Sequence, residues 1–202
     1  MRKVYSYLFV IVVATLLQNV FAAQQEFPHE LPGLHNLVQL SADVWSGSEP
    51  AGEQAFASLM DLGVQTIISV DSARPNVDMA RKYGIRYVHV PFGYDGIPLT
   101  AQLSLTRAAR DVRTPLYIHC HHGKHRGPAA AAIVCRVRGI VDASGALKIL
   151  ENAGTSHDYK GLWKDVEHFA APSDDAELPP LLEVSEVESL PAAMARIDRH
   201  SA

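Results

Sequence analysis

The chain has 202 residues, a formal net charge of −4, 48% apolar residues and 20% charged residues. This length suffices for one domain with a proper core and is too short for two of ordinary size. The composition excludes a chain that is disordered throughout, and the small negative charge argues against a general nucleic-acid binder. Anion binding must therefore come from a local cluster of positive charge.

The first 22 residues have the layout of a secretory signal peptide. Arg2 and Lys3 precede an apolar run at 7–17, and small residues around Ala22 provide a cleavage site. An uncleaved membrane anchor is the alternative, but the apolar run is short for a span. We expect export to the periplasm or the medium, with no membrane span after cleavage. Loss of Arg2 and Lys3 leaves 16 basic and 22 acidic residues, a mature charge of 16 − 22 = −6.

The remaining chain divides into an irregular lead-in over 23–36, one domain over 37–171, and a Pro-rich acidic tail over 172–202 with one amphipathic helix near its end. Within the domain, segments with strand and helix periodicity alternate, which predicts an α/β fold with a mostly parallel central sheet flanked by helices. The expected strands are 38–45, 64–70, 86–90 and 116–119. The expected helices are 51–62, 76–83, 100–112, 128–138, 143–152 and 162–169, with turns or loops at 46–50 and 91–98.

One segment concentrates the chemistry, the sequence HCHHGKHRG at 119–127. The preceding strand delivers Cys120 to the edge of the sheet, Gly123 lets the backbone curl, and Pro128 suits the first turn of the next helix. Loop N–H groups beside the positive end of a helix dipole form an anion site. Arg126 adds a planar fork that matches two phosphate oxygens. The segment therefore predicts a phosphate cradle.

Cys120 is placed to act as a nucleophile in this cradle. The positive surroundings stabilise its thiolate, so we expect its pKa to fall below the usual ~8.5. A thiolate beneath a phosphate can attack phosphorus in line, while Arg126 and the loop amides face the oxygens that gain charge. The second cysteine, Cys135, is expected to pack in the following helix. A helix rises about 1.5 Å per residue, so the two sulfurs should lie too far apart for a disulfide.

The residues His119-Cys120-x-x-Gly123-x-x-Arg126 resemble the signature of the protein tyrosine phosphatase superfamily, and the small chain is most similar to its dual-specificity-phosphatase-like branch. The resemblance covers residues 36–170. It implies the cysteine-phosphatase fold, a phosphoric monoester hydrolase that works through a phosphocysteine intermediate, and neither cofactor nor metal. It implies catalytic roles for Cys120 and Arg126, with His119 ordering the loop. The expected substrate-binding residues are His119, His121, His122, Gly123, Lys124, His125 and Gly127.

The cationic residues of the loop bear on the substrate. The run Lys124-His125-Arg126 looks like the loop of inositol-phosphate and phosphoinositide phosphatases, and extra cations suit several phosphates. We expect a phosphorylated protein or a polyphosphorylated small molecule as partner, no nucleic acid, and a monomer. One departure concerns Gly127, where the family usually has Ser or Thr. That hydroxyl is understood to hydrogen-bond the departing sulfur, so its absence should slow hydrolysis of the phosphocysteine.

The leaving group needs a proton, which the family supplies from an Asp on a separate loop. Asp95 follows a strand and lies in a Gly- and Pro-containing loop whose flexibility would suit closure over substrate. Asp71, directly after the strand at 64–70, is the alternative donor, and we favour Asp95. A simple turn role for Asp95 is the remaining interpretation.

Other functions stay open at this level. A catalytically weak phospho-ligand-binding module of the same fold is favoured by Gly127 and by an oxidising location. A rhodanese or arsenate reductase is less favoured, because neither chemistry requires the Lys- and His-rich loop with its Arg. A metal site on Cys120 and the neighbouring histidines is disfavoured, since no second ligand pair has matching spacing.

Overall fold

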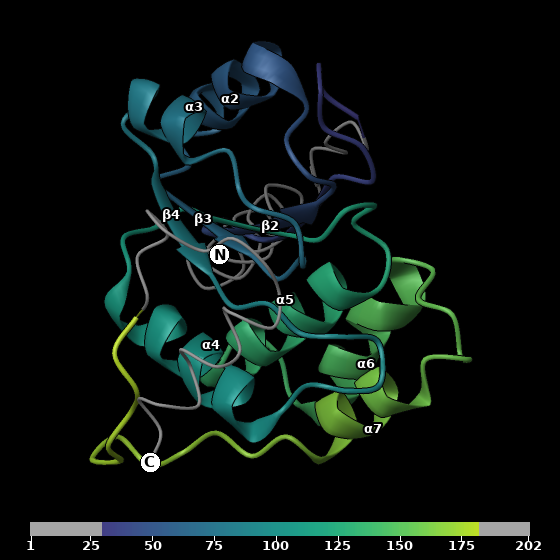
Figure 1. Ribbon diagram of the computed structural model, residues 1–202. Helices are drawn as coiled ribbons and strands as arrows, with labels where there is room; N and C mark the ends of the chain where they lie inside the picture. The colour runs from purple at the N-terminus through teal and green to yellow at the C-terminus, as the bar shows by residue number, and fades with distance from the viewer. Residues whose placement is uncertain (1–29, 182–202) are drawn as a thin grey trace, which may run out of the picture.

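The computed structural model describes residues 30–181, which form a five-stranded sheet between two layers of helices (Figure 1). The predicted signal peptide, the first half of the lead-in (23–29) and the C-terminal helix lie outside the described residues. The strands are β1 (Val38–Ser41), β2 (Val44–Gly47), β3 (Thr66–Ser69), β4 (Arg86–His89) and β5 (Leu116–His119). The helices are α2 (Gly52–Asp61), α3 (Val77–Lys82), α4 (Leu99–Asp111), α5 (Arg126–Val137), α6 (Ala143–Asn152) and α7 (Lys160–His168).

The order of the strands brings four chain segments to one edge of the sheet. The order is β1-β2-β5-β3-β4, and only the pair β1–β2 is antiparallel, which confirms the predicted mostly parallel sheet. The last residues of the parallel strands lie side by side in register: Gly47, His119, Ser69 and His89. The segments that leave these strands therefore meet at the carboxyl edge, where α/β sheets bind ligands.

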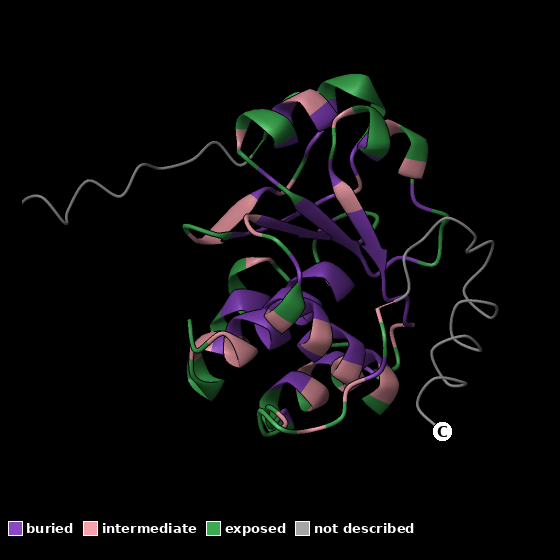
Figure 2. Ribbon diagram, turned by 90° about the vertical axis from the view of Figure 1, so that its left-hand side faces the viewer, coloured by how far each residue is buried: buried purple, intermediate pink, exposed green. Residues whose placement is uncertain are grey.

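The sheet is buried on both faces because its side chains alternate in direction. Ile67 and Tyr117 belong to the core beneath α2 and α3, whereas Ile68 and Ile118 belong to the larger core against α4 to α7. Figure 1 shows α2 and α3 above the sheet and the other four helices below it. Figure 2 shows buried strands between helices whose outer faces are exposed. No helix within residues 30–181 is long and apolar enough to span a bilayer.

The predicted strand at 38–45 was wrong in one respect, because the structure divides it into the hairpin β1–β2. A two-residue turn at 42–43 interrupts the strand, and Ser41 Oγ accepts the N–H of Asp43 there (3.2 Å). Hydrophobic alternation resumes after so short a turn, so periodicity could not reveal it. The predicted turn at 46–50 begins correspondingly late, since Ser46 and Gly47 still pair with β5.

The loop at 91–98 is packed more firmly than its composition suggested. Asp165 of α7 accepts a hydrogen bond from the N–H of Ile97 (2.6 Å). Gly161, in the first turn of the same helix, lies so close to Asp95 that a Cβ atom there would overlap the Asp95 carbonyl group. The expectation of flexible surroundings for Asp95 is therefore corrected, because tertiary contacts with α7 support the loop backbone.

The first residues of the predicted tail also lie against the domain. Arg110 of α4 donates hydrogen bonds to the carbonyl oxygens of Pro172 (2.6 Å) and Ser173 (3.1 Å), and it forms an ion pair with Asp174 (3.3 Å). The carbonyl groups after α7 thus find a partner on α4. This contact holds the segment after α7 against α4.

The close approach of α7 to the loop yields a stability prediction. We expect Gly161→Ala to destabilise the fold by roughly 1–3 kcal/mol, because the added methyl group must displace the loop backbone. Alanine in place of glycine within a helix ordinarily stabilises by about 0.5–1 kcal/mol, so the sign is diagnostic. Urea unfolding measures the difference. Lys160→Ala, an exposed change in the same turn, should stay within about 0.5 kcal/mol of the wild type; a gain in stability for Gly161→Ala would contradict the packing described.

Candidate active site

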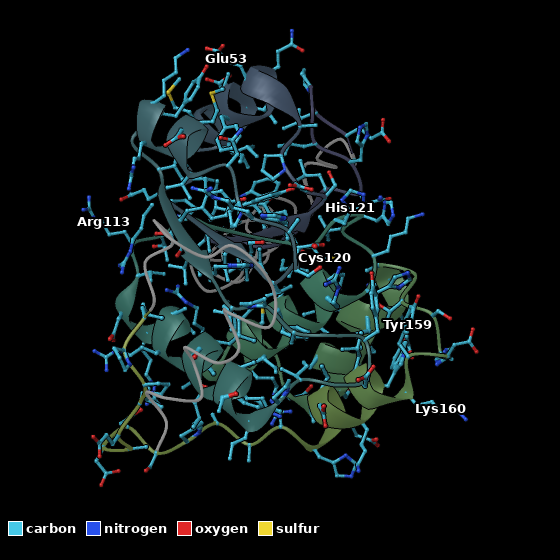
Figure 3. All side chains as sticks on the ribbon, in the orientation of Figure 1. Glu53, Arg113, Cys120, His121, Tyr159 and Lys160 are labelled. Carbon is cyan, nitrogen blue, oxygen red and sulfur yellow. The ribbon has the colours of Figure 1, made fainter. Side chains whose placement is uncertain are left out.

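The segment after β5 curls against β2 and ends in α5. Cys120 is the first residue beyond β5 and is buried, with 2% of its surface exposed. Gly123 has a positive φ of 73°, and a Cβ atom there would overlap the backbone of Gly47, so only glycine fits. The N–H of Glu49 donates to the carbonyl of His121 (3.1 Å) and ties the loop to the chain after β2. Figure 3 shows Cys120 and His121 together where the sheet meets the lower helices.

Helix α5 begins at Arg126, two residues earlier than the predicted start at Pro128. Its N-cap residue, His125, makes no side-chain capping hydrogen bond. The positive end of the helix dipole, together with N–H groups that have no partner inside the helix, therefore faces the loop. This is the arrangement in which a helix N-terminus binds an anion.

The guanidinium of Arg126 is turned toward the carboxyl edge of the sheet. Its Nη2 donates to Asp71 Oδ2 (2.8 Å) and to the hydroxyl of Tyr94 (3.3 Å), and its Nη1 donates to the carbonyl of Phe92 (3.3 Å). The ring of Tyr94 also lies 4.4 Å from the guanidinium carbon, within range of a cation–π contact. Among residues 30–181, Nε has no acceptor. Three of the five N–H groups of Arg126 are thus engaged, and two, on Nε and Nη1, remain.

Asp71 is buried beside Arg126, and its contacts favour the ionised form. Burial by itself raises the pKa of this carboxyl, but hydrogen bonds from the N–H groups of Ala73 (3.0 Å) and His121 (2.7 Å) and the charge of Arg126 bring the pKa below its usual value. An ionised carboxylate has no proton to deliver. The alternative assignment of Asp71 as general acid is therefore disfavoured on physical grounds.

Asp95, the favoured general acid, lies on the exposed side of the loop at 91–98. It lines a surface hollow with the start of α4, Gln102 and Asp165. Two of the contacts of Arg126 come from this same loop, at Phe92 and Tyr94, three residues and one residue before Asp95. The loop thus reaches the cradle, and the proton-donor role of Asp95 stays a prediction.

His119 lies beneath the cradle and cannot line a substrate surface, which corrects its place among the substrate-binding residues. It is 1% exposed, its Nδ1–H faces the Cys120 carbonyl (3.4 Å), and its Nε2 accepts from the hydroxyl of Tyr87 (2.6 Å). Burial lowers the pKa of His119 to about 4, although the Cys120 carbonyl and the charge of Asp71 act in the opposite direction. The imidazole is therefore neutral and supports the loop from below, as the resemblance implied.

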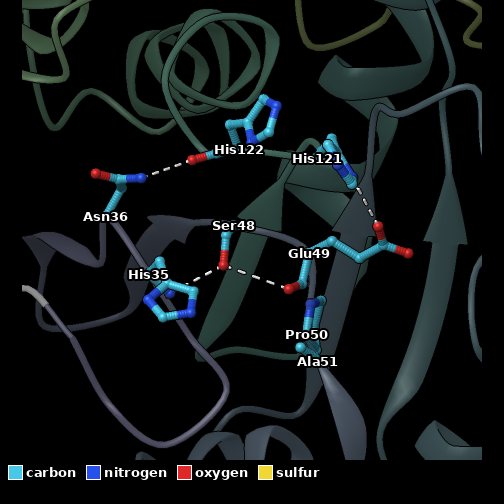
Figure 4. A pocket seen from close by; sticks show the side chains of 8 residues that line it. All are labelled: His35, Asn36, Ser48, Glu49, Pro50, Ala51, His121 and His122. Atoms are coloured by element: carbon cyan, nitrogen blue, oxygen red, sulfur yellow. Dashed lines mark hydrogen bonds and ion pairs between the residues drawn. The ribbon is translucent and has the colours of Figure 1, made fainter.

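His121 and His122 are exposed on the outer side of the loop, over a hollow shown in Figure 4. His121 Nδ1 lies 3.1 Å from Glu49 Oε2, and the two histidine rings are 4.4 Å apart. Asn36 donates its side-chain amide to the carbonyl of His122 (2.9 Å) from a backbone with a φ of 51°. The predicted rim residues therefore border a polar hollow beside the cradle.

The other half of the loop rests on the segment between α6 and α7. Thr155 donates its hydroxyl to the Lys124 carbonyl (2.7 Å), and the N–H of Ser156 donates to His125 Nδ1 (3.3 Å). Burial, followed by the charges of Lys124 and other nearby groups, lowers the pKa of His125. Lys124 is exposed, whereas Lys160 lies at the outer edge of the molecule, away from Cys120 (Figure 3).

Two aromatic residues that the sequence did not single out complete the wall of the site. The rings of Tyr94 and Tyr159 are 4.6 Å apart, and the ring of His125 is 4.7 Å from that of Tyr159. Tyr94 directly precedes the predicted Asp95, and this position in the sequence could have indicated it. Asn36 offered none, because 86 residues separate it from its partner His122.

Two further expectations concern the second cysteine, Cys135, and a metal site. Cys135 is fully buried in α5, where burial raises the pKa of its thiol to about 12, and its predicted packing role is confirmed. Cys120 and Cys135 are both free thiols. Within residues 30–181, no three His, Cys, Asp or Glu side chains are grouped to hold a metal ion.

The low pKa of His119 predicts a pH dependence of stability. Between pH 6.5 and about 4 the unfolded chain binds a proton at this histidine and the folded chain does not, so the free energy of unfolding should fall as pH decreases through this range. The full shift is worth about 3 kcal/mol. In urea titrations, His119→Gln should flatten the profile by up to that amount. His168→Gln, at an exposed position, is the control, and equal slopes for both variants would contradict the assignment.

Comparison with known proteins finds solved structures with a similar fold. No protein-family model and no curated protein matches the chain by sequence. The structure of P. aeruginosa TpbA is similar with a TM-score of 0.58 and 23% identity, over 70% of this chain and 89% of that chain. TpbA in complex with phosphotyrosine is similar with a TM-score of 0.52 and 21% identity, over 66% and 91%.

A second phosphatase from another organism shares the architecture. The catalytic core of the PP-IP phosphatase Siw14 from S. cerevisiae has a TM-score of 0.57 and 17% identity, over 70% of this chain and 87% of that chain. At such identities the likeness concerns the fold. The fold of this chain is accordingly similar to that of TpbA and Siw14, which agrees with the cysteine-phosphatase fold that its Cys-x5-Arg loop predicted.

Proposed function

We propose that the chain is a cysteine-dependent phosphatase that hydrolyses phosphate monoesters. The observation that carries this proposal is the closeness of Cys120 to the N-terminus of α5, where a Cβ atom at Gly127 would lie 3.4 Å from Cys120 Sγ. Arg126, the first residue of this helix, supplies a buried cation held by Asp71. A sulfur nucleophile beside a positive helix end and an arginine suits attack on a phosphate ester.

The proposed reaction has two steps. In the first, the Cys120 sulfur attacks phosphorus, a sulfur–phosphorus bond forms, and the bond to the ester oxygen breaks while Asp95 gives that oxygen a proton. In the second, water attacks the phosphocysteine and gives a proton back to Asp95, the sulfur–phosphorus bond breaks so that the sulfur leaves as thiolate, and inorganic phosphate is released. Arg126 and the α5 N–H groups stabilise the charge that develops on the phosphoryl oxygens in both steps.

The neighbouring structures suggest two substrate classes. TpbA was solved with phosphotyrosine, and Siw14 is a PP-IP phosphatase. For this chain, Lys124 and the rim histidines favour a substrate with several negative charges, whereas the Tyr94–Tyr159 wall would also accept an aromatic ring. We propose a phosphorylated protein or a polyphosphorylated small molecule, bound by a monomer. We also propose export, on the basis of the residues before position 23.

A second candidate function is a phospho-ligand-binding module with weak turnover. The observation in its favour is Gly127, which supplies no hydroxyl to the sulfur. A Cβ atom at this position would lie 3.4 Å from Cys120 Sγ and 3.0 Å from the Cys120 nitrogen. A side chain at 127 would therefore border the sulfur but would also require the backbone to move by a few tenths of an ångström.

Steady-state assays with p-nitrophenyl phosphate test the proposal. Cys120→Ser should reduce turnover to the uncatalysed background, and Asp95→Asn should reduce kcat by roughly 100-fold, the contribution of a general acid. Lys160→Ala should retain full activity. Equal turnover in the wild type and Cys120→Ser would remove Cys120 from the mechanism. Phosphate binding without turnover by the wild type would favour the binding module.

The contribution of the missing hydroxyl can be measured with two substitutions at one site. Gly127→Ser should speed hydrolysis of the phosphocysteine and diminish a burst of product, by roughly tenfold for one hydrogen bond to a charged sulfur. Gly127→Ala adds the same Cβ without the hydroxyl and therefore measures the crowding alone. Rapid-quench kinetics report both steps. If serine behaves like alanine, the hydroxyl does not limit this enzyme.

A further inference from the structure

We propose that Asp71 is a positioning residue of the active site. Its carboxylate holds the Arg126 guanidinium where it can receive a substrate phosphate, and it fixes the loop backbone at His121 by accepting that residue's N–H. This role rests on the proposed phosphatase function, because it presumes that the cradle takes a phosphoryl group. It assigns to Asp71 a task different from proton donation.

The surroundings of Asp71 demand a carboxylate at this position. Oδ2 accepts from Arg126 Nη2 (2.8 Å) and from the His121 N–H (2.7 Å). Oδ1 accepts from the Ala73 N–H (3.0 Å) and from the Ser72 hydroxyl (3.4 Å). All four partners are donors, and only an ionised carboxylate accepts on both oxygens. A protonated acid or an asparagine amide would point one of its own hydrogens toward one of these donors.

The same oxygen serves two parts of the cradle. His121 directly follows Cys120, and Arg126 opens α5 at the far end of the loop. Oδ2 of Asp71 joins the backbone at the start of the loop to the guanidinium at its end. One carboxylate oxygen thereby sets the position of the guanidinium relative to the start of the loop.

The pair is buried, which gives the carboxylate control over the guanidinium. The side chains of Arg126 and Asp71 are 6% and 7% exposed. An arginine keeps its charge in the interior, so it must remain beside a counter-charge. The bond to Asp71 is 2.8 Å, whereas the bonds to Phe92 and Tyr94 are 3.3 Å. Asp71 therefore determines where the guanidinium rests, and within residues 30–181 its Nε has no acceptor.

Hydrogen bonds hold the backbone of Asp71, which fixes the point from which its side chain extends. The carbonyl of Asp71 accepts from Nε2 of His89 (2.6 Å), a buried residue at the end of β4 whose pKa is lowered by burial. The N–H of Asp71 donates to the hydroxyl of Ser69 (3.3 Å) at the end of β3. Two adjacent strands thus hold the residue independently of any substrate.

Two other roles for Asp71 predict different effects on oxyanion binding and on activity. If Asp71 were a resident anion that competes with phosphate for Arg126, removal of its charge would strengthen oxyanion binding. If Asp71 were the general acid, its loss would matter most for substrates with poor leaving groups, whose oxygen needs the proton. Positioning predicts weaker oxyanion binding and a loss that does not depend on the leaving group.

The experiment compares Asp71→Asn with Asp95→Asn on p-nitrophenyl phosphate and on phosphoserine, and measures tungstate binding by calorimetry. Asp71→Asn should lower kcat/KM by roughly 10- to 100-fold on both substrates, the effect of a misplaced catalytic group. It should weaken tungstate binding by roughly tenfold, the effect of one poorly placed donor set. Asp95→Asn should lose more activity on phosphoserine than on the aryl ester and keep its tungstate affinity.

Controls separate this role from a general loss of structure. Asp78→Asn, at an exposed site on α3, should match the wild type, and urea unfolding reports whether Asp71→Asn folds. If it does not, Asp71→Glu, which keeps the charge one methylene away, decides through the same two measurements. Wild-type kcat/KM and tungstate affinity in that variant would overturn the proposal.

The other possible results distinguish failure of the role of Asp71 from failure of the phosphatase function. Tighter tungstate binding by Asp71→Asn, or a loss confined to phosphoserine, would overturn the positioning role while leaving the phosphatase function intact. An inactive wild type would overturn the proposed function instead, and weaker tungstate binding by Asp71→Asn would still support the role of Asp71. A wild type that neither turns over substrate nor binds tungstate would overturn both.

Discussion

A guanidinium buried at the edge of an apolar sheet constrains most of the surrounding structure. Arg126 is charged at every accessible pH, so its burial requires a counter-charge and hydrogen-bond acceptors within reach. Three different segments provide them: Asp71 after β3, and Phe92 and Tyr94 after β4. Because these strands are parallel neighbours of β5, their carboxyl ends meet where Arg126 emerges. The order of the strands thus brings together the groups that the buried charge of Arg126 requires.

The groups beneath the cradle limit how many charges are buried there. His119 and His89 both have pKa values lowered chiefly by burial, so both are neutral near pH 7. Each uses one ring nitrogen to hold a backbone carbonyl, that of Cys120 or that of Asp71. The buried charges that remain at this edge are Asp71 and Arg126, which form a pair. An anion that enters the cradle therefore meets an arginine whose position is already set.

The outer parts of the site show a different physical character. His121, His122 and Lys124 are exposed, and the two histidines line a surface hollow. The charge of an exposed lysine acts at long range, but salt screens it. The aromatic contact between Tyr94 and Tyr159, by contrast, joins the loop after β4 to the segment before α7. The packing of Gly161 under Asp95 reinforces this join.

Local sequence determined the elements and the chemistry of this protein, and tertiary structure decided which groups meet. Hydrophobic periodicity sufficed for the alternation of strands and helices, and the nine residues 119–127 sufficed for a sulfur nucleophile beside an anion site, because both are properties of contiguous chain. Periodicity missed the hairpin β1–β2, since alternation continues across a two-residue turn. It could not distinguish an Asp that pairs with Arg126 from one on an exposed loop, because 55 residues separate Asp71 from its partner. Only the parallel order of β3 and β5 brings these two together, and burial then decides the protonation state of the carboxyl.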